Sequence, residues 1–496
     1  LEKKFPDSAI SGPVKPIVYY VDPATPAQWK PWVKKGVETW QRAFEAAGFR
    51  NAIVARDAPT AAQNPDWSPD DIRNTVVRWL PSTTENADGP NVHDPRSGEI
   101  LNGSVRIHHN VLNLARDWYF TQVAPLDPRA HALPFPDSLM GRLVEYVVAH
   151  EVGHTLGFQH NMKASSMYPA DSVRSRTWVR RMGHTPTIMD YARFNYVAQP
   201  GDNIPLDDLV PGIGPYDLFA ARWGYAPVRG ARTSDDERAT LDALARQQDS
   251  IPWYRFSTSG NHDSDAGDEA EAVGDADPVK STALGIQNIR RTIPLLMPAT
   301  LHQGEDNSDL KELYEKLVDQ WELEMEHVAN VVGSSDSQEK YGGQSGPRFT
   351  PVSRSRQKAA VSFLAANAFR TPHFLLDSAI LRRIEPDGAL RRIGSAQSRV
   401  LLQLLDNDRL MRLSENAALA PNSANVYQPG EMLSDVRSAV WSELSQPRVT
   451  IDPFRRYLQR AWLADADSKL NPTPAVVIVA EPSRARRARG MFAPNS

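Results

Sequence analysis

HEVGHTLGFQH, residues 150–160, is the stretch of sequence that carries most of the information about this chain. His150 and His154 are four residues apart, so on a helix they lie on one face, about one turn apart, and can share a metal ion. Gly157 can adopt the left-handed conformation that ends a helix. The chain then turns, and His160 returns as a third ligand. The spacing therefore predicts a three-histidine metal site at the end of a helix.

Glu151 follows the first histidine and can reach a water molecule on the metal without being a ligand itself. Three imidazoles with one open coordination position are typical of catalytic zinc, whereas structural sites fill all four positions. The alternative is a buried amphipathic helix that happens to carry histidines. That alternative requires three histidines, a glutamate and a turn glycine to coincide, so we favour a catalytic site with one Zn²⁺.

The pattern HExxHxxGxxH resembles the signature of metzincins, which also have a methionine-containing turn below the metal. Two segments compete for this Met-turn. Residues 166–169 (SMYP) resemble the turn of matrixins, and residues 187–191 (TIMDY) resemble the Ser-x-Met-x-Tyr turn of astacins and serralysins. We favour Met189, because residues 188–200 (IMDYARFNYVAQP) are similar to the segment found here in a group of large bacterial zinc-dependent metalloproteases. The alternative for either methionine is core packing.

Tyr191 stands two residues after Met189. In astacins and serralysins the tyrosine at this place contacts the zinc and moves away to stabilise the oxyanion when substrate binds. The resemblance implies the same catalytic role for Tyr191, whose phenol can donate a hydrogen bond to a developing negative charge. The alternative is a tyrosine that packs behind the turn.

Further segments of the chain resemble the same bacterial group. The resemblance as a whole runs from about Lys15 to Phe369, and the last hundred residues are less recognisable. The further segments are DPRSGEIL at 94–101, GIGPYD at 212–217 with WGY at 223–225, and DPVK at 277–280 with LGI at 284–286. They identify relatives without identifying chemistry. The resemblance implies an α+β fold: a metzincin-like catalytic domain, with a twisted mixed sheet and an active-site helix, followed by a mainly α-helical C-terminal region.

The composition bounds the function further. The chain has 496 residues, 41% of them hydrophobic, and a formal net charge of −4, which gives no reason to expect nucleic acid or membrane binding. It has no cysteine, which excludes disulfides, thiolate zinc ligands and a cysteine-switch form of latency. No apolar run reaches the length of a transmembrane helix. Nothing in the composition indicates an oligomeric state.

The chain begins at Leu1 and shows no signal segment, so we expect the natural chain to have been shortened at its front. The resemblance implies a bacterial protein exported to the periplasm or the extracellular space. We expect three parts: a catalytic domain at 1–225, an acidic connection with short elements at 226–305, and a mainly helical C-terminal domain at 306–496.

Within the catalytic domain, residues 103–110 form the candidate edge strand, along which metzincins bind substrate backbone by strand addition. Val105 and Ile107 are its expected substrate-binding positions. His108 and His109 are adjacent, so on a strand they point to opposite faces and cannot easily chelate one ion. We expect one of them to be buried and the other exposed.

Beyond the catalytic domain, the acidic residues between 263 and 271 fail the EF-hand order, because Gly274 stands where the loop requires glutamate. A Ca²⁺ site is therefore not supported by a clear motif, and a solvated loop is favoured. An apolar stripe from Leu310 to Val332 predicts a long helix. Residues 333–351 are expected to form a flexible linker.

These observations favour a zinc-dependent endopeptidase that acts on protein or peptide substrates through a zinc-activated water and Glu151 as general base. One alternative keeps the site but narrows the substrate, as in a zinc amidase or a processing enzyme for cell-envelope peptides. A second alternative is an inactive zinc-fold binding module. The second is disfavoured because neither the glutamate nor any ligand is lost.

Overall fold

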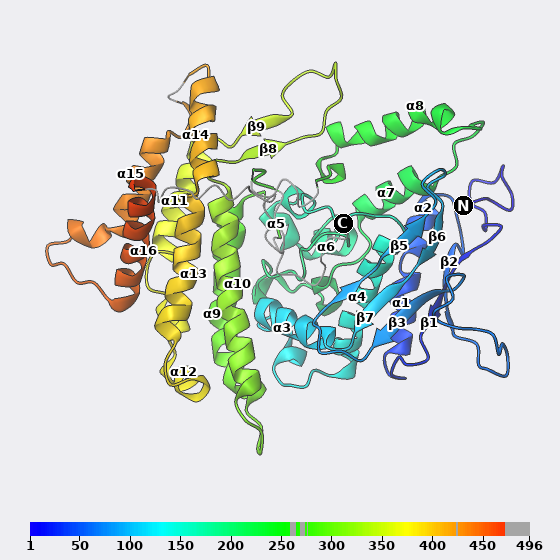
Figure 1. Ribbon diagram of the computed structural model, residues 1–496, viewed down its shortest axis with the longest axis horizontal. Coiled ribbons are helices and arrows are strands. Elements are labelled where there is room, and N and C mark those ends of the chain that lie inside the picture. Colours follow the sequence, from blue (N-terminus) through cyan, green and yellow to red (C-terminus); the bar gives the residue numbers. More distant parts are fainter. Residues whose placement is uncertain (258–263, 268–272, 275, 423–424, 472–496) are drawn as a thin grey trace.

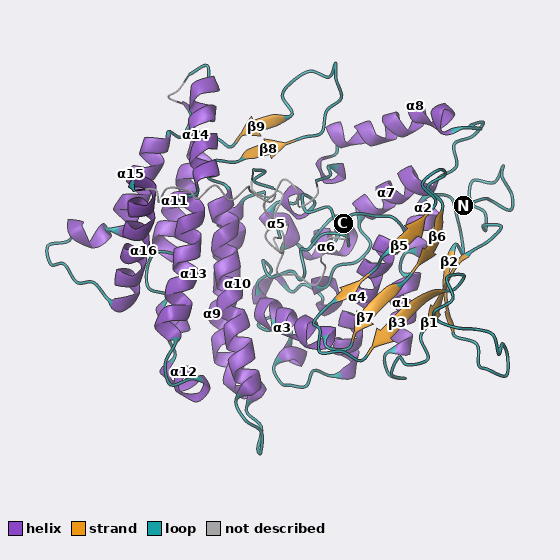
Figure 2. Cartoon of the chain, viewed as in Figure 1, coloured by secondary structure: helices purple, strands orange, loops and turns teal. Residues whose placement is uncertain are grey.

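The chain folds into an α+β part, which contains the histidine-rich helix, and a stack of long helices beside it (Figures 1 and 2). The structure is a computed structural model that describes residues 1–257, 264–267, 273–274, 276–422 and 425–471. The first part holds a mixed sheet, and the second holds the helices from α9 onward. This arrangement confirms the predicted fold class.

The sheet has the strand order β2-β1-β3-β7-β4. The first four strands are parallel to their neighbours, and β4 is antiparallel to β7. The strands are β1 (Ile17–Val21), β2 (Ile53–Asp57), β3 (Thr75–Leu80), β4 (Ala87–Asp88) and β7 (Val105–His108). β5 (Asn91–His93) and β6 (Ile100–Gly103) form a separate antiparallel hairpin between β4 and β7 in the sequence.

The expected edge strand was wrong. β7 carries Val105 and Ile107, but it lies between β3 and β4, so both of its sides are hydrogen-bonded. Both side chains are buried in the core. The two residues of β4 form the edge of the sheet among the described strands, so any strand addition at this edge takes place along β4.

The helix α4 (Asp137–Thr155) crosses the sheet close to α1 (Lys30–Glu38). A glycine explains the close crossing, because a Cβ at Gly36 would stand 2.7 Å from the carbonyl oxygen of Glu145. Val33 and Val37 of α1 are fully buried, and the indole Nε1 of Trp40 donates a hydrogen bond to the Ala149 carbonyl at 2.7 Å. Packing from several elements therefore fixes α4 in the centre of this part.

Further helices of the first part surround this core. They are α2 (Gln41–Ala46), α3 (Val111–Val123), α5 (Ala170–Val173), α6 (Arg176–Met182), α7 (Pro215–Tyr225) and α8 (Ser234–Ala245). α7 packs against α2. Short 3-10 turns shape the connections, among them η2 (Ser165–Met167), η5 (Arg246–Asp249) and η6 (Pro252–Tyr254).

The second part is a set of helices, the longest of which stand side by side (Figure 1). They are α9 (Pro278–Thr300), α10 (Ser308–Asn330), α11 (Arg354–Asn367), α12 (Ser378–Ile384), α13 (Ala389–Leu404), α14 (Asn407–Leu419), α15 (Pro429–Val440) and α16 (Pro453–Leu470). The apolar stripe of α10 is buried, as predicted. None of the described helices is long and apolar enough to span a bilayer.

Two expectations for the connecting segments were wrong. The acidic connection contains α9, which is 23 residues long and packs along α10 instead of forming a short element. The expected linker at 333–351 contains an antiparallel hairpin of β8 (Ser335–Ser337) and β9 (Phe349–Pro351). α9 and the β8–β9 hairpin are placed by contacts with distant parts of the chain, which their own sequences do not reveal.

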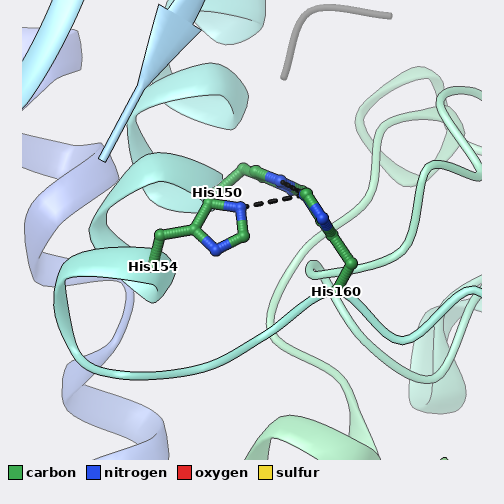
Figure 3. Close-up of side chains that lie close together, drawn as sticks. All are labelled: His150, His154 and His160. Atoms are coloured by element: carbon green, nitrogen blue, oxygen red, sulfur yellow. Dashed lines mark hydrogen bonds between the residues drawn. The ribbon is translucent and has the colours of Figure 1, made fainter. Parts of the chain in front are cut away.

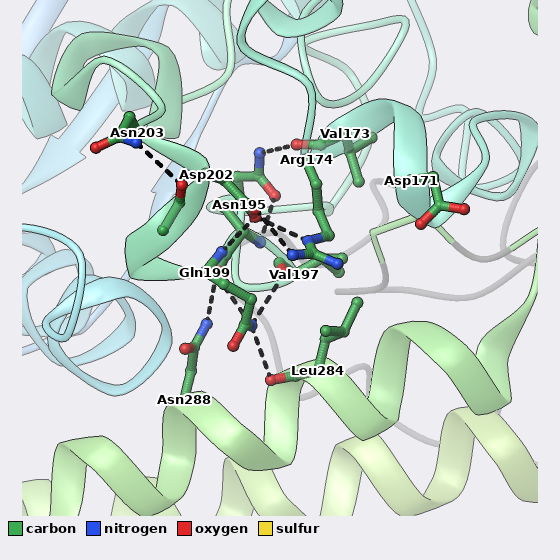
Figure 4. Close-up of polar contacts among 12 residues, drawn as sticks. Asp171, Val173, Arg174, Asn195, Val197, Gln199, Asp202, Asn203, Leu284 and Asn288 are labelled. Carbon is green, nitrogen blue, oxygen red and sulfur yellow. Dashed lines mark hydrogen bonds and ion pairs between the residues drawn. The ribbon is translucent and has the colours of Figure 1, made fainter.

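A polar network holds α9 against the loop that precedes α7 (Figure 4). The Gln199 amide donates to the Leu284 carbonyl at 3.2 Å. The amide of Asn288 donates to the carbonyls of Tyr196 and Ala198, at 2.8 and 2.7 Å. These bonds satisfy buried carbonyls of an irregular loop, which otherwise carry a large desolvation cost. The helical part thus supports the loop on which the candidate site rests.

Candidate metal centre

The three predicted histidines converge (Figure 3). His150 and His154 project from the last turns of α4. Gly157 then has φ +91°, the left-handed turn that the sequence predicted, and the chain returns with His160. The Nε2 atom of His160 lies 3.2 Å from that of His150 and 2.9 Å from that of His154. Zinc ligands at about 2.0–2.1 Å in tetrahedral geometry stand roughly 3.3 Å apart, so this donor set fits zinc.

Backbone carbonyls orient two of the rings. Nδ1 of His150 donates to the Ile188 carbonyl at 2.7 Å, and Nδ1 of His154 donates to the Phe158 carbonyl at 2.9 Å. A proton on Nδ1 leaves the lone pair on Nε2, the atom that faces the other rings. The tautomer and the ring orientation are thus set for metal binding by the surrounding backbone.

Burial keeps the imidazoles neutral. It lowers the pKa of His150 well below its ordinary value, that of His154 to about 4, and that of His160 to about 2. The neighbouring histidines lower the pKa of His150 and His160 further. Neutral imidazole is the form that binds a metal, so the site is ready to bind one at neutral pH.

Glu151 is fully buried beside this group. Burial, together with the nearby carboxylate of Asp88, raises the pKa of Glu151 well above its ordinary value. Neither carboxylate oxygen has a hydrogen-bond partner among the described residues. A buried carboxylate with unused acceptors and a raised pKa is the kind of group that serves as a general base.

Met189 lies beneath α4. Its side chain is 1% exposed, and a Cβ on Gly153 of α4 would stand 2.2 Å from its Sδ. The Met189 carbonyl accepts a hydrogen bond from the backbone N–H of Asn161, just after the third histidine, at 3.1 Å. Met167, the competing methionine, is half-buried on η2.

Asp217 anchors the segment that carries Met189, and the sequence argument did not single it out as a site residue. Its carboxylate accepts hydrogen bonds from the backbone N–H of Ile188 at 3.0 Å, from that of Gly214 at 2.7 Å, and from the Thr187 hydroxyl. Burial raises the pKa of Asp217 to about 7, against the opposing effect of these donors. The available signal was its place in the first turn of α7, after Gly-Pro, where acidic residues cap helices.

Tyr191 lies against the third histidine. Its ring centroid is 4.4 Å from that of His160 and 5.8 Å from that of His150. The guanidinium of Arg193 lies 4.5 Å from the Tyr191 ring centroid and 3.8 Å from that of Trp118 on α3. Arg193 is fully buried, and its charge contributes to the lowered pKa values of His150 and His160. No feature of the sequence marked Arg193.

A large cleft opens onto the centre. Its volume is about 2180 Å³, and its lining includes Glu151, His154 and His160. Residues 88–91, at and after the edge strand β4, line it, whereas Val105 and Ile107 do not. At Gly89 the backbone passes so close to α4 that a Cβ would stand 2.2 Å from the Glu151 carbonyl oxygen. The sheet edge therefore lies directly beside the metal centre.

Among the described residues, the other metal candidates are not part of this cluster. His108 is half-buried and His109 is exposed, and His150, His154 and His160 are the one cluster of potential metal ligands found in the part of the chain that the structure describes. Of the acidic residues between 263 and 271, all but Asp265 lie outside the described residues. Asp265 forms a buried ion pair with Lys163.

Comparison with curated proteins and comparison with solved structures found no match. A family model described as Met-zincin matches residues 132–448, which is more than half of the chain and includes the histidines, Met189 and the helices from α9 to α15. With three histidines already placed around one point, this match shows that the chain belongs to the Met-zincin family and is a zinc metallopeptidase of the metzincin clan.

Proposed function

We propose that the protein is a zinc-dependent endopeptidase that hydrolyses internal peptide bonds, with His150, His154 and His160 as metal ligands and Glu151 as general base. The observation that carries this proposal is the buried carboxylate of Glu151, which has no partner among the described residues and adjoins three converging imidazoles. A structural zinc site does not need such a carboxylate, because four protein ligands fill its coordination shell.

His150, His154 and His160 would hold the zinc, which would supply Lewis acidity and lower the pKa of a neighbouring water to about 7. Glu151 would accept a proton from the water that attacks the scissile carbonyl. The same carboxyl then delivers the proton to the amine that leaves. Its raised pKa suits both steps, because the group must be basic enough to take the proton and acidic enough to return it.

Tyr191 is the proposed donor to the oxyanion that forms from the scissile carbonyl. The packing of its ring against His160, with centroids 4.4 Å apart, supports this role. A preorganised donor acts on the charge that develops in the transition state, and removal of one such donor costs roughly 10²–10³ in kcat. Met189, beneath α4, is proposed to support the ligands as the methionine of the Met-turn.

The substrate backbone is proposed to add to the sheet along β4. This edge strand is antiparallel to β7, and residues 88–91 line the cleft next to Glu151. Strand addition uses main-chain hydrogen bonds, so it accepts many sequences. It also places an extended chain across the metal centre.

The size of the cleft bears on the alternatives. Pockets for small ligands measure roughly 300–1,000 Å³, and this cleft has about 2180 Å³. That volume favours a polymeric substrate over a small amide. A processing enzyme for cell-envelope peptides is also compatible with a cleft of this size. We further propose that the protein is exported to the periplasm or the extracellular space, and only the resemblance to the bacterial metalloproteases supports this localisation.

The test measures bound zinc and cleavage of denatured casein for the wild type, Glu151→Gln and Glu145→Gln. Glu145 lies on the same helix, half-buried beside Arg142, and is the matched control. We expect one zinc in all three proteins, with activity lost only in Glu151→Gln. Full activity of Glu151→Gln contradicts the assignment. Zinc binding without cleavage of casein by the wild type, but with cleavage of single peptides, favours the narrow processing enzyme.

A further inference from the structure

Aromatic side chains gather on one side of the cleft that contains the metal centre. We call this group the aromatic wall: Tyr216, Phe219 and Trp223 of α7, Tyr254 of η6, and Phe256. The same cleft is lined by His154 and His160. The wall lies beyond the end of α4, where Tyr225 of α7 donates its hydroxyl proton to the Leu156 carbonyl at 2.8 Å. It is therefore built from elements that hold no metal ligand.

The aromatic wall is a rigid platform with an exposed edge. Phe219 and Tyr254 stack with ring centroids 4.3 Å apart and planes 10° apart, and Tyr216 stacks on Phe256 at 6.4 Å. Trp223, on the same helix, is 49% exposed. Stacked rings keep their orientation without a ligand, so little conformational entropy is lost when one binds.

A loop of the second part of the chain also lines this cleft. Tyr341, in the hairpin loop between β8 and β9, lines the cleft and is 48% exposed. Its ring stacks on the guanidinium of Arg246 at 4.3 Å, and its hydroxyl donates to the carboxylate of Asp242 at 3.2 Å. The loop is thus fixed to α8 and η5, and it presents a further ring to the cleft.

Large apolar side chains left open to water in a cleft indicate a binding surface. Tryptophan and tyrosine are enriched among the few residues that dominate the binding energy at protein interfaces. The charges on this side argue against a basic ligand group, because Arg246 already covers one face of Tyr341 and Glu339 is paired with Arg348. The surface fits an uncharged, large and apolar group.

We propose that the aromatic wall, together with Tyr341, is a substrate subsite that binds one large apolar side chain, aromatic or long aliphatic, of an extended polypeptide. This inference rests on the proposed peptidase function and gives its substrate class. The occupant is a polypeptide because the surface is continuous with the metal centre and the sheet edge in one cleft that exceeds the size of a small-molecule pocket.

Selectivity is the first test. Denatured casein is digested by the wild type, Trp223→Ala, Tyr341→Ala and Leu419→Ala, and the cut sites are determined by mass spectrometry. Leu419 is 83% exposed on α14 and lies outside the cleft lining, so its variant is the matched control. We expect the wild type and the control to show large apolar residues at one fixed distance from the cut bond. Trp223→Ala loses this preference, and the KM of a peptide with phenylalanine there rises roughly tenfold with kcat nearly unchanged.

A binding measurement separates this inference from the peptidase function. Two fluorescent extended peptides are compared, one with phenylalanine and one with alanine at the position where the cut sites show the apolar preference. Each peptide is titrated into Glu151→Gln protein with and without Trp223→Ala. We expect the phenylalanine peptide to bind roughly tenfold more tightly, and Trp223→Ala to remove the difference. Equal binding of both peptides, or a difference that survives both Trp223→Ala and Tyr341→Ala, overturns the subsite. Absence of cleavage with the binding difference intact overturns only the peptidase function.

Discussion

Gly153 lies directly over the sulfur of Met189. A Cβ at position 153 would stand 2.2 Å from Met189 Sδ and 2.6 Å from Cζ2 of Trp40, so only glycine leaves room for both side chains. The two histidines of α4 flank this position in sequence. The packing of a methionine under a helical glycine thus fixes the height of α4 above the loop that carries Met189.

Gly153→Ala is therefore expected to destabilise the fold by about 1–3 kcal/mol, because the added methyl group overpacks a full core, and to weaken zinc retention. Denaturant unfolding and zinc analysis after dialysis measure the two effects. Gly430→Ala is the control, since a Cβ at Gly430 on α15 meets no atom within 4 Å, and it should be neutral or stabilising by up to about 1 kcal/mol. The double variant Gly153→Ala with Met189→Ala should lose less stability than the sum of the two single variants.

Tyr191→Phe is expected to lower kcat roughly 100-fold while KM and zinc content stay close to those of the wild type. The ring remains against His160, but the donor to the oxyanion is lost. Tyr168→Phe is the control, because the Tyr168 hydroxyl donates to the Met182 carbonyl at 3.2 Å and belongs to a separate buried cluster. That variant should lose about 1 kcal/mol of stability and keep its kcat. An unchanged kcat in Tyr191→Phe would show that Tyr191 only packs behind the turn and does not act on the oxyanion.

Arg193 is expected to act through Tyr191, because its planar guanidinium stacks between the rings of Tyr191 and Trp118. Arg193→Lys keeps the charge and loses the planar stack. It should lower kcat in the wild-type background and have little further effect in Tyr191→Phe. Equal losses in both backgrounds would show that Arg193 acts independently of the phenol.

The sequence predicted those elements whose pattern is local. The long helix α10 follows from the apolar stripe that begins at Leu310, and the turn at Gly157 follows from a single glycine and the spacing of the histidines. The edge strand was missed, because the alternation of Val105 and Ile107 indicates burial but does not reveal which strand pairs on either side. Strand order is decided by contacts that are distant in sequence.

The same reason explains why Arg193 and the structure of residues 333–351 were not predicted from the sequence. The guanidinium of Arg193 lies over the ring of Trp118, a residue of α3 that is distant in sequence, and a buried arginine has no local signature. The glycine- and serine-rich composition of 333–351 is typical of a linker. Yet its loop is fixed by contacts with side chains far away along the chain: Gln344 of the loop donates to the Asp249 carboxylate at 3.0 Å. Composition cannot predict such pairings.

Lys163 and Asp265 form a buried ion pair that connects the loop after the third histidine to the hairpin. Nζ lies 2.6 and 2.8 Å from the two carboxylate oxygens, both side chains are at most 3% exposed, and the Ser337 hydroxyl of β8 bonds to both groups. Lys163→Met leaves a buried carboxylate without its counter-ion, so we expect a loss of about 3–5 kcal/mol in the free energy of unfolding.

Denaturant unfolding measures this loss, and Lys469→Met is the control. Lys469 pairs with Asp465 on the surface of α16, where such pairs contribute about 0.3–0.5 kcal/mol. The double variant Lys163→Met with Asp265→Leu removes both charges and should recover much of the stability. Similar losses for Lys163→Met and Lys469→Met would mean that the buried pair does not hold the hairpin in place.

Glu431 of α15 gives the helical part a measurable pH dependence. Hydrogen bonds from Arg354 and then Lys358 of α11 lower the pKa of Glu431 to about 2 from an ordinary value of 4.5. Because the folded pKa lies below the unfolded one, the unfolded chain takes up the proton first as the pH falls. The stabilisation by this carboxylate is complete above pH 4.5 and is lost as the pH falls toward 2.

Glu431→Gln should therefore lower the thermal midpoint at pH 7, and the difference from the wild type should shrink between pH 4.5 and the lowest pH at which both proteins fold. Circular dichroism melts at several pH values measure this difference, with the exposed Glu415→Gln on α14 as the control that should show none. A difference that is the same at pH 7 and pH 3 would mean that the variant acts through packing and not through the charge of the carboxylate.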